Sequence, residues 1–144
     1  MAGALHSAAI HLLRAVRKED EQSGVGPARL SALSVLVFGG PMRLTDLARV
    51  EQVRPPTMTK IVNGLAESGL VRRRMDAADA RAVKVEATAR GQKLLLEGRR
   101  RRVERLAAAL RGLPRGETAT LERAAAIIAR LAASVLSRPG VASA

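Results

Sequence analysis

A short stretch of the chain, residues 54–74, combines side chains that can read DNA with a run of arginines: RPPTMTKIVNGLAESGLVRRR. Lys60 can reach guanine acceptors or a phosphate, and Asn63 can pair bidentately with adenine. Threonine side chains suit a phosphate oxygen or a thymine methyl group. The candidate DNA-binding residues in this stretch are therefore Arg54, Pro55, Thr57, Thr59, Lys60 and Asn63. The alternative is a solvated helix face whose polar side chains contact only water.

A second group of cations follows directly. Between Arg43 and Arg102 the sequence has 15 basic and 7 acidic residues, so positive charge is concentrated here. An arginine at a loop tip, such as Arg81, suits a narrow minor groove, where the potential is most negative. Asp79 can orient Arg81, although an exposed pair of this kind can also be a bare ion pair worth ~0 to 1 kcal/mol. This second candidate set comprises Arg72, Arg73, Arg74, Asp79, Arg81 and Lys84.

The apolar pattern predicts which elements present these residues. Met58, Ile61, Val62 and Leu65 fall on one side of a helix, which leaves the candidate residues on the opposite side. Two prolines fit the first helical positions, where their missing N–H groups would lack intrahelical partners, and Gly69 fits the position just past the end. The strict alternation in 83–87 then predicts a half-buried strand, paired with a strand at about 70–75 in a projecting hairpin.

Three helices are expected before this segment, at 4–17, about 28–38 and about 45–51. Gly39, Gly40 and Pro41 separate the last two of these, and Thr45 is placed as the N-cap of the third, with Asp46 in its first turn. Thr88 can cap a long helix through about Leu113, and a last helix runs from about 117 to 136. The predicted fold class is mainly α (α+β).

The composition restricts the classes of function. The net charge is +12 and the calculated pI is 11.7, which favours a polyanionic partner. Cysteine is absent, which excludes disulfides, thiol redox sensing and cysteine-based metal sites. We expect no cofactor and no metal site, because no ligand cluster, phosphate loop or paired catalytic group is present; an enzyme is the weakest hypothesis. The N-terminus lacks a signal-peptide pattern and no run is long enough to cross a membrane, so a cytoplasmic protein is expected.

Helices outside the central segment carry more apolar surface than one small lobe can cover, which indicates an interface. A two-fold dimer would place two DNA-reading helices about one DNA turn apart. The alternative is a bundle within one chain. The arginines at 99–102, with Arg105, are expected to be a solvated face; contact with flanking phosphates or an acidic partner is the alternative. The candidate dimer residues are Leu5, Leu12, Leu13, Val16, Ile127, Ile128, Leu131 and Val135.

Residues 44–91 resemble the winged helix-turn-helix core of the MarR family of bacterial transcriptional regulators. The matching residues, in the spacing of the family, are Leu47-Ala48, Thr57-x-Thr59-Lys60-x-Val62-x-x-Leu65, Gly69-Leu70-Val71-x-Arg73, Asp79-x-Arg81 and Thr88-x-x-Gly91. The chain departs from the family at Ala80, where a basic residue is common, and at Ala87, where leucine is common. The resemblance implies a single MarR-like domain over 1–144, with a DNA-binding lobe at 28–88 and a helical dimerisation region at 4–22 and 89–137.

Two functions follow as hypotheses. The first is a sequence-specific transcriptional regulator, a homodimeric repressor that binds double-stranded DNA at a pseudo-palindromic operator and is released by a small-molecule effector. The alternative is an architectural, nucleoid-type protein that binds DNA without sequence preference. The second would show nearly equal affinity for random duplexes, with a steep dependence on salt. The effector is left open, since Phe38 is the only aromatic residue available to contact an aromatic ligand.

Overall fold

The computed structural model describes residues 1–75 and 83–137, and the side chains of Glu19, Leu136 and Ser137 are not included in that description. The chain divides into two compact units, Met1–Arg105 and Leu106–Ala144. Each unit is considered by itself below. The predictions for Asp79, Ala80 and Arg81 lie outside the described residues.

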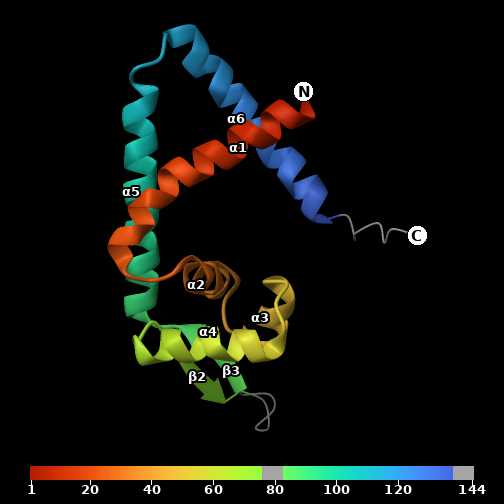
Figure 1. Cartoon of the computed structure of the whole chain (residues 1–144), viewed down its shortest axis with the longest axis vertical. Coiled ribbons are helices and arrows are strands. Elements are labelled where there is room, and N and C mark those ends of the chain that lie inside the picture. The colour runs from red at the N-terminus through yellow and green to blue at the C-terminus, as the bar shows by residue number, and fades with distance from the viewer. Residues whose placement is uncertain (76–82, 138–144) are drawn as a thin grey trace, which may run out of the picture. The chain divides into compact units, whose positions relative to one another are not determined.

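The described elements include every helix and strand that the sequence predicted, in the predicted order, together with η1 and β1, which it did not predict (Figure 1). The first unit begins with α1 and a 3-10 helix and continues through the lobe into α5, and the second contains α6. Their bounds are α1 Ala2–Arg17, η1 Lys18–Ser23, α2 Pro27–Gly39, β1 Met42–Arg43, α3 Leu44–Val50, α4 Pro55–Glu67, β2 Val71–Met75, β3 Val83–Ala87, α5 Ala89–Leu110 and α6 Arg115–Ser137.

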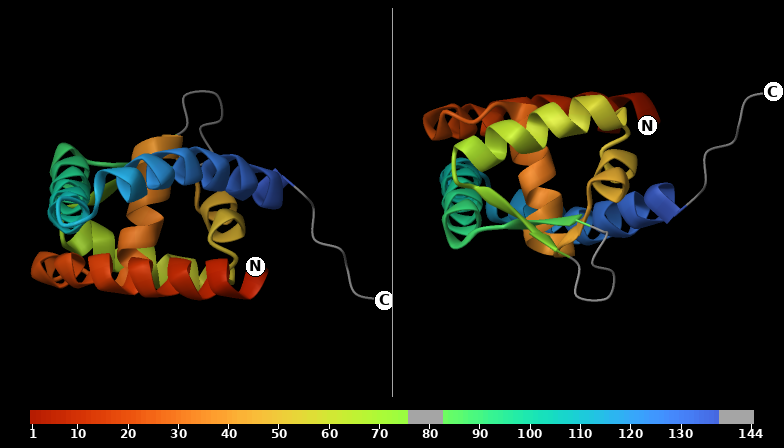
Figure 2. Two further views of the ribbon diagram at one scale, coloured as in Figure 1. Left: turned by 90° about the horizontal axis from the view of Figure 1, so that it is seen from above. Right: turned by 90° about the horizontal axis from the view of Figure 1, so that it is seen from below.

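One hydrophobic core holds α2, α3, α4 and the small sheet together. Helix α2 crosses over α4 and reaches the strands, which places it at the centre of this lobe (Figure 2). Leu33 of α2, Leu47 of α3 and Leu65 of α4 are fully buried. The remaining buried hydrophobic residues of this core are Ala32, Leu36, Ala48, Met58, Val62, Leu70, Val71, Val85 and Leu95. The apolar stripe predicted for α4 is therefore the side of that helix that faces the core.

Both predicted ends of α4 are confirmed. Pro55 and Pro56 occupy the first two helical positions. Gly69 follows the C-cap residue Ser68 and has φ +68°, a left-handed conformation that glycine adopts without steric cost. The amide of Gly69 donates to the carbonyl of Ala66, and the amide of Leu70 donates to the carbonyl of Leu65, both at 2.9 Å. This pair of hydrogen bonds is a Schellman motif, and it turns the chain directly into β2.

The predicted hairpin of β2 and β3 is confirmed, and the sheet contains a third strand that was not predicted. The strand order is β1-β3-β2, with both pairings antiparallel. Strand β1 has only two residues, Met42 and Arg43, which pair with Val85 and Lys84. A two-residue strand has no alternation of its own, so no periodic pattern could reveal it.

The start of α3 differs from the prediction. Its N-cap residue is Arg43, with no side-chain cap hydrogen bond, and Thr45 lies inside the helix. The prediction was wrong because β1 leads into α3 without a break, so the N-cap lies two residues earlier, at Arg43 instead of Thr45. Beyond the end of α3, Gln52 has φ +54° although it is not a glycine. The amide of the next residue, Val53, donates to the carbonyl of Ala48 and closes the turn between α3 and α4.

Thr88 caps α5 as predicted and also links this helix to the end of α4. Its hydroxyl oxygen accepts from the amide of Gly91 at 3.1 Å and donates to the carbonyl of Gly69 at 2.7 Å. A Cβ atom on Gly91 would collide with the carbonyl oxygen of Leu70 and lie 3.1 Å from a methyl group of Leu33. Glycine is required here because the backbone of α5 approaches the backbone next to β2 so closely.

Candidate nucleic-acid interface

The side of α4 that faces away from the core carries the predicted DNA-reading residues. Thr57, Lys60 and Asn63 are exposed, as are Arg54 and Pro55 at the start of the helix. Thr59 is half-buried, and its hydroxyl donates to the carbonyl of Pro55 at 3.0 Å. The hydroxyl of Thr59 is thus engaged with the first turn of its own helix. Three polar side chains, those of Thr57, Lys60 and Asn63, therefore project from α4 to solvent.

Arg73 is held against α4 rather than projecting freely from the hairpin. Its Nη2 donates to Oδ1 of Asn63 at 2.6 Å. Because side chains alternate along a strand, Arg73 lies on the same face of β2 as the buried Val71 and is directed toward the helix. Asn63 therefore has its amide oxygen already engaged, which leaves its NH₂ group to donate to an acceptor.

Glu86 lies beside two candidate residues of the hairpin, and the sequence analysis did not include it. It is paired opposite Arg72 in the sheet and is only 8% exposed. Its carboxylate accepts from Nε of Arg72 at 2.5 Å and lies 3.7 Å from Nη1 of Arg74. Strand alternation with a two-residue spacing places these two arginines on one face, where a single buried carboxylate orients both. The cross-strand register, which depends on the hairpin, is the signal that would have identified it.

Three cations stand side by side across the three strands. Arg43 pairs with Lys84 in β3, and Lys84 pairs with Arg74 in β2. The pairing places all three side chains on one face of the sheet, the face that also carries Arg72. Lys84 and Arg74 were predicted as DNA-binding residues, whereas Arg43 was not, because β1 was not expected.

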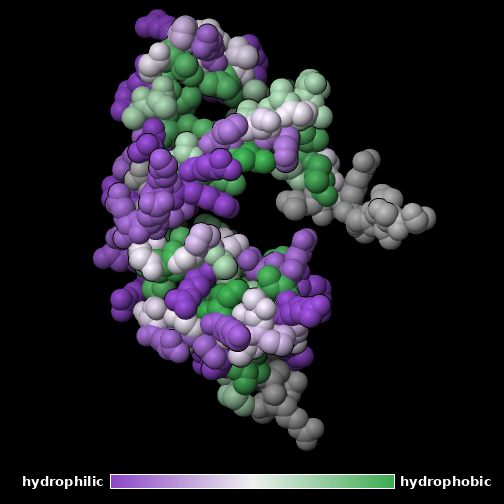
Figure 3. Space-filling view, in the orientation of Figure 1, coloured by the Kyte–Doolittle hydropathy of each residue, from purple (hydrophilic) through white to green (hydrophobic). Residues whose placement is uncertain are grey.

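The arginines of α5 differ from the expectation of a solvated face. Arg99 and Arg100 are exposed, but Arg101 and Arg102 are half-buried. Arg102 forms an ion pair with Asp20 of η1, and their side chains are only 26% and 20% exposed. Figure 3 shows hydrophilic side chains gathered over the middle of α5, where these residues lie. The prediction was therefore wrong for Arg102, which ties η1 to α5.

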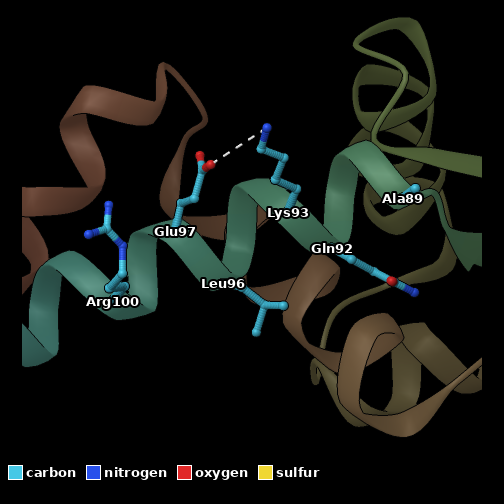
Figure 4. A pocket seen from close by; sticks show the side chains of 6 residues that line it. All are labelled: Ala89, Gln92, Lys93, Leu96, Glu97 and Arg100. Atoms are coloured by element: carbon cyan, nitrogen blue, oxygen red, sulfur yellow. Dashed lines mark ion pairs between the residues drawn. The ribbon is translucent and has the colours of Figure 1, made fainter.

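A shallow hollow of about 430 Å³ lies along the first half of α5. Its lining residues all come from this one helix, and two of them, Lys93 and Glu97, form an ion pair of 4.0 Å along the helix (Figure 4). The side chain of Leu96 is 50% exposed, so the hollow is open to solvent. The lining residues are Ala89, Gln92, Lys93, Leu96, Glu97 and Arg100. It therefore offers a surface rather than an enclosed ligand site.

The residues predicted to form a dimer interface are accessible within their own units. Of these residues, Val16 is half-buried and the other seven are exposed, with Ile127 56% and Leu131 46% exposed. Hydrophobic side chains along α6 reach the surface in Figure 3. None of the helices in residues 1–75 and 83–137 is long and apolar enough to cross a membrane.

Comparison with known proteins identifies the family. Residues 27–83 match the model of the MarR family. An HTH-type transcriptional regulator of Mycobacterium tuberculosis is 37% identical over 131 residues, which cover 91% of this chain and 92% of the relative.

Solved structures have the same fold. RV1404 from Mycobacterium tuberculosis superposes with a TM-score of 0.84 at 20% identity, covering 97% of this chain and 94% of that one. NadR in complex with 4-hydroxyphenylacetate superposes with a TM-score of 0.63 at 28% identity, covering 88% of this chain and 89% of that one. A mutant of S. aureus MepR bound to an oligodeoxyribonucleotide superposes with a TM-score of 0.69 at 19% identity, covering 93% of this chain and 96% of that one. The fold, the family model and the mycobacterial relative agree, and the chain belongs to the MarR family of winged-helix, DNA-binding transcriptional regulators, which are not enzymes.

Proposed function

We propose that this regulator is a homodimeric repressor that reads a pseudo-palindromic operator with α4 and releases it when a small molecule binds. The proposal depends mainly on one observation: Thr57, Lys60 and Asn63 are exposed on α4 while its opposite side is buried in the core. A helix presented in this way fits the major groove, where each base pair has a distinct pattern of donors and acceptors. The proposed partner is chromosomal DNA, which places the protein in the cytoplasm.

The strands β2 and β3 are proposed to contact the DNA backbone beside α4. Arg72 and Arg74 are oriented by Glu86, and the row of Arg43, Lys84 and Arg74 supplies further positive charge. Arg54 and Pro55 are proposed to lie near phosphates at the start of α4. Arg81, oriented by Asp79, is proposed to enter the minor groove. Arg81→Ala should then weaken binding more on AT-rich than on GC-rich flanking sequence.

A dimer is proposed because the apolar residues of α1 and α6 are exposed in the isolated chain. An isologous pairing of two copies would set two α4 helices about one DNA turn (roughly 34 Å) apart. In this proposal residues 28–88 bind DNA, and the helices at 4–22 and 89–137 form the dimer. A small-molecule effector is proposed by analogy with NadR, whose structure contains 4-hydroxyphenylacetate. We propose that the protein represses transcription from this operator rather than activating it.

Lys60→Ala tests whether α4 reads bases. If Lys60 contacts a guanine, the variant should lose about 1 to 3 kcal/mol of binding free energy and relax the preference at one position of each half-site. The measurement is selection of bound fragments from the source genome, followed by titration of the wild type and variant on the selected duplex. Arg111→Ala removes the same charge from the turn after α5 and is the matched control.

The competing hypothesis, architectural binding, makes the opposite prediction. Such a protein would recover no shared motif from the genome and would bind selected and random duplexes almost equally at physiological salt. That result, or a protected region without two related half-sites, would refute the sequence-specific repressor.

A further inference from the structure

A glycine in the C-terminal half of α4, Gly64, accommodates the guanidinium group of Arg29, a side chain of α2. Gly64 is buried, although it lies on the edge of the exposed side of α4. A Cβ atom built on Gly64 would lie 2.5 Å from Cζ and 2.8 Å from Nε of Arg29, and it would also collide with Nη2. The guanidinium group thus occupies the space in which any other residue at position 64 would place its side chain.

This position borders the proposed DNA-reading surface. Residues four apart lie on the same side of a helix, so the guanidinium of Arg29 lies one turn beyond Lys60. Arg29 is exposed, and it makes no hydrogen bond or ion pair within residues 1–75 and 83–137. An arginine with its donors unused at the edge of this surface is available to an anion that approaches α4.

We propose that Arg29 contacts the DNA backbone. Its side chain extends from α2 to the side of α4, where the absence of a side chain on Gly64 leaves room for the guanidinium group. The inference rests on the proposed function, because it requires α4 to face DNA. A helix in the major groove has a sugar-phosphate backbone along each side, so a cation on its edge meets phosphates rather than base edges. The planar guanidinium can donate two parallel hydrogen bonds to one phosphate.

A purely structural role is the competing explanation. Gly64 lies in the C-terminal half of α4, where the helix dipole favours a nearby cation. In that case Arg29 would stabilise the lobe and have no direct effect on DNA affinity. The two roles differ in what they predict for Gly64→Ala. The added methyl group displaces only the end of a flexible side chain, and alanine has a higher helix propensity than glycine.

The experiment compares Arg29→Ala, Gly64→Ala and the double variant on the duplex selected by the wild-type protein. We expect each single variant to weaken binding about tenfold, as for loss of one hydrogen-bonded charge. The slope of log affinity against log salt concentration should become shallower by about one for each single variant. The double variant should bind no more weakly than either, because both changes remove the same contact. The melting temperature of Gly64→Ala should equal or exceed that of the wild type.

Two controls make the result decisive. Arg111→Ala removes one positive charge elsewhere and should retain wild-type affinity. Lys60→Ala tests the proposed function separately. Weakened binding by Lys60→Ala together with wild-type binding by Arg29→Ala would overturn this inference and leave the function intact. Wild-type binding by both variants would overturn both. If Arg29→Ala lowers the melting temperature while Gly64→Ala binds DNA as tightly as the wild type, Arg29 is structural and the inference is wrong.

Discussion

The winged lobe and the helices that flank it place their hydrophobic side chains in opposite environments. In the lobe, Leu33, Leu47 and Leu65 are fully inaccessible to solvent. In α1, no side chain is buried, and in α6 the described side chains are all exposed or half-buried. Both regions are rich in leucine, isoleucine, valine and alanine, so composition does not explain the difference.

The difference in burial indicates that the lobe and the flanking helices have different roles. The lobe can bury its apolar side chains by itself, because three helices and a sheet converge on one core. The apolar residues of the flanking helices require another surface, and a patch of this kind usually marks an interface. We propose that a second copy of the chain provides that surface. In this proposal the lobe presents α4 to DNA, and the flanking helices set the spacing between the two lobes.

The largest expected effect is loss of the lobe core. Leu33→Ala removes a fully buried side chain that contacts the region of Gly91 and should lower the free energy of unfolding by about 2 to 5 kcal/mol. The matched control is Leu131→Ala in α6, an exposed position whose substitution should cost under about 0.5 kcal/mol in a monomeric sample. Urea denaturation at low protein concentration measures both. Equal losses would contradict the difference between the two regions.

A smaller effect, on DNA affinity, is expected from disrupting the proposed dimer. Ile127→Asp combined with Leu131→Asp places charge on the exposed apolar side of α6 and should give a monomer in sedimentation experiments. Affinity for a duplex with two half-sites should fall by about 100-fold because the second lobe no longer binds intramolecularly.

Binding of this double variant to a duplex with one half-site should be nearly unchanged. Arg111→Ala combined with Arg115→Ala changes the net charge by the same amount and should remain dimeric. A dimer that survives the two aspartates would show that this side of α6 is not the interface.

The sequence predicted the lobe well where local signals are strong. The prolines, the apolar stripe and Gly69 defined α4, and the alternating residues defined β3. It failed where structure depends on distant partners. Strand β1 exists only because Met42 and Arg43 lie beside β3, and Gln52 adopts a positive φ where no glycine marks the turn.

In the candidate site, too, features set by local sequence were predicted and contacts between distant residues were not. Exposure of Lys60 and Asn63 followed from helical periodicity, because the buried stripe determines the opposite side. Their neighbours could not be predicted in the same way. The contact of Asn63 with Arg73, the arrangement of two arginines around Glu86, and the position of Arg29 over Gly64 all join different elements. Each requires the three-dimensional placement of one element against another.

The smallest expected effect concerns the junction where the lobe meets α5. Thr88→Ala removes the side chain that accepts from the amide of Gly91 and donates to the carbonyl of Gly69. The free energy of unfolding should fall by about 1 kcal/mol, which is typical for loss of an N-cap. Thr88→Ser retains the hydroxyl and should recover most of this loss in thermal or urea unfolding. If serine and alanine destabilise the protein equally, the hydroxyl contributes little and the methyl group of Thr88 is the stabilising part.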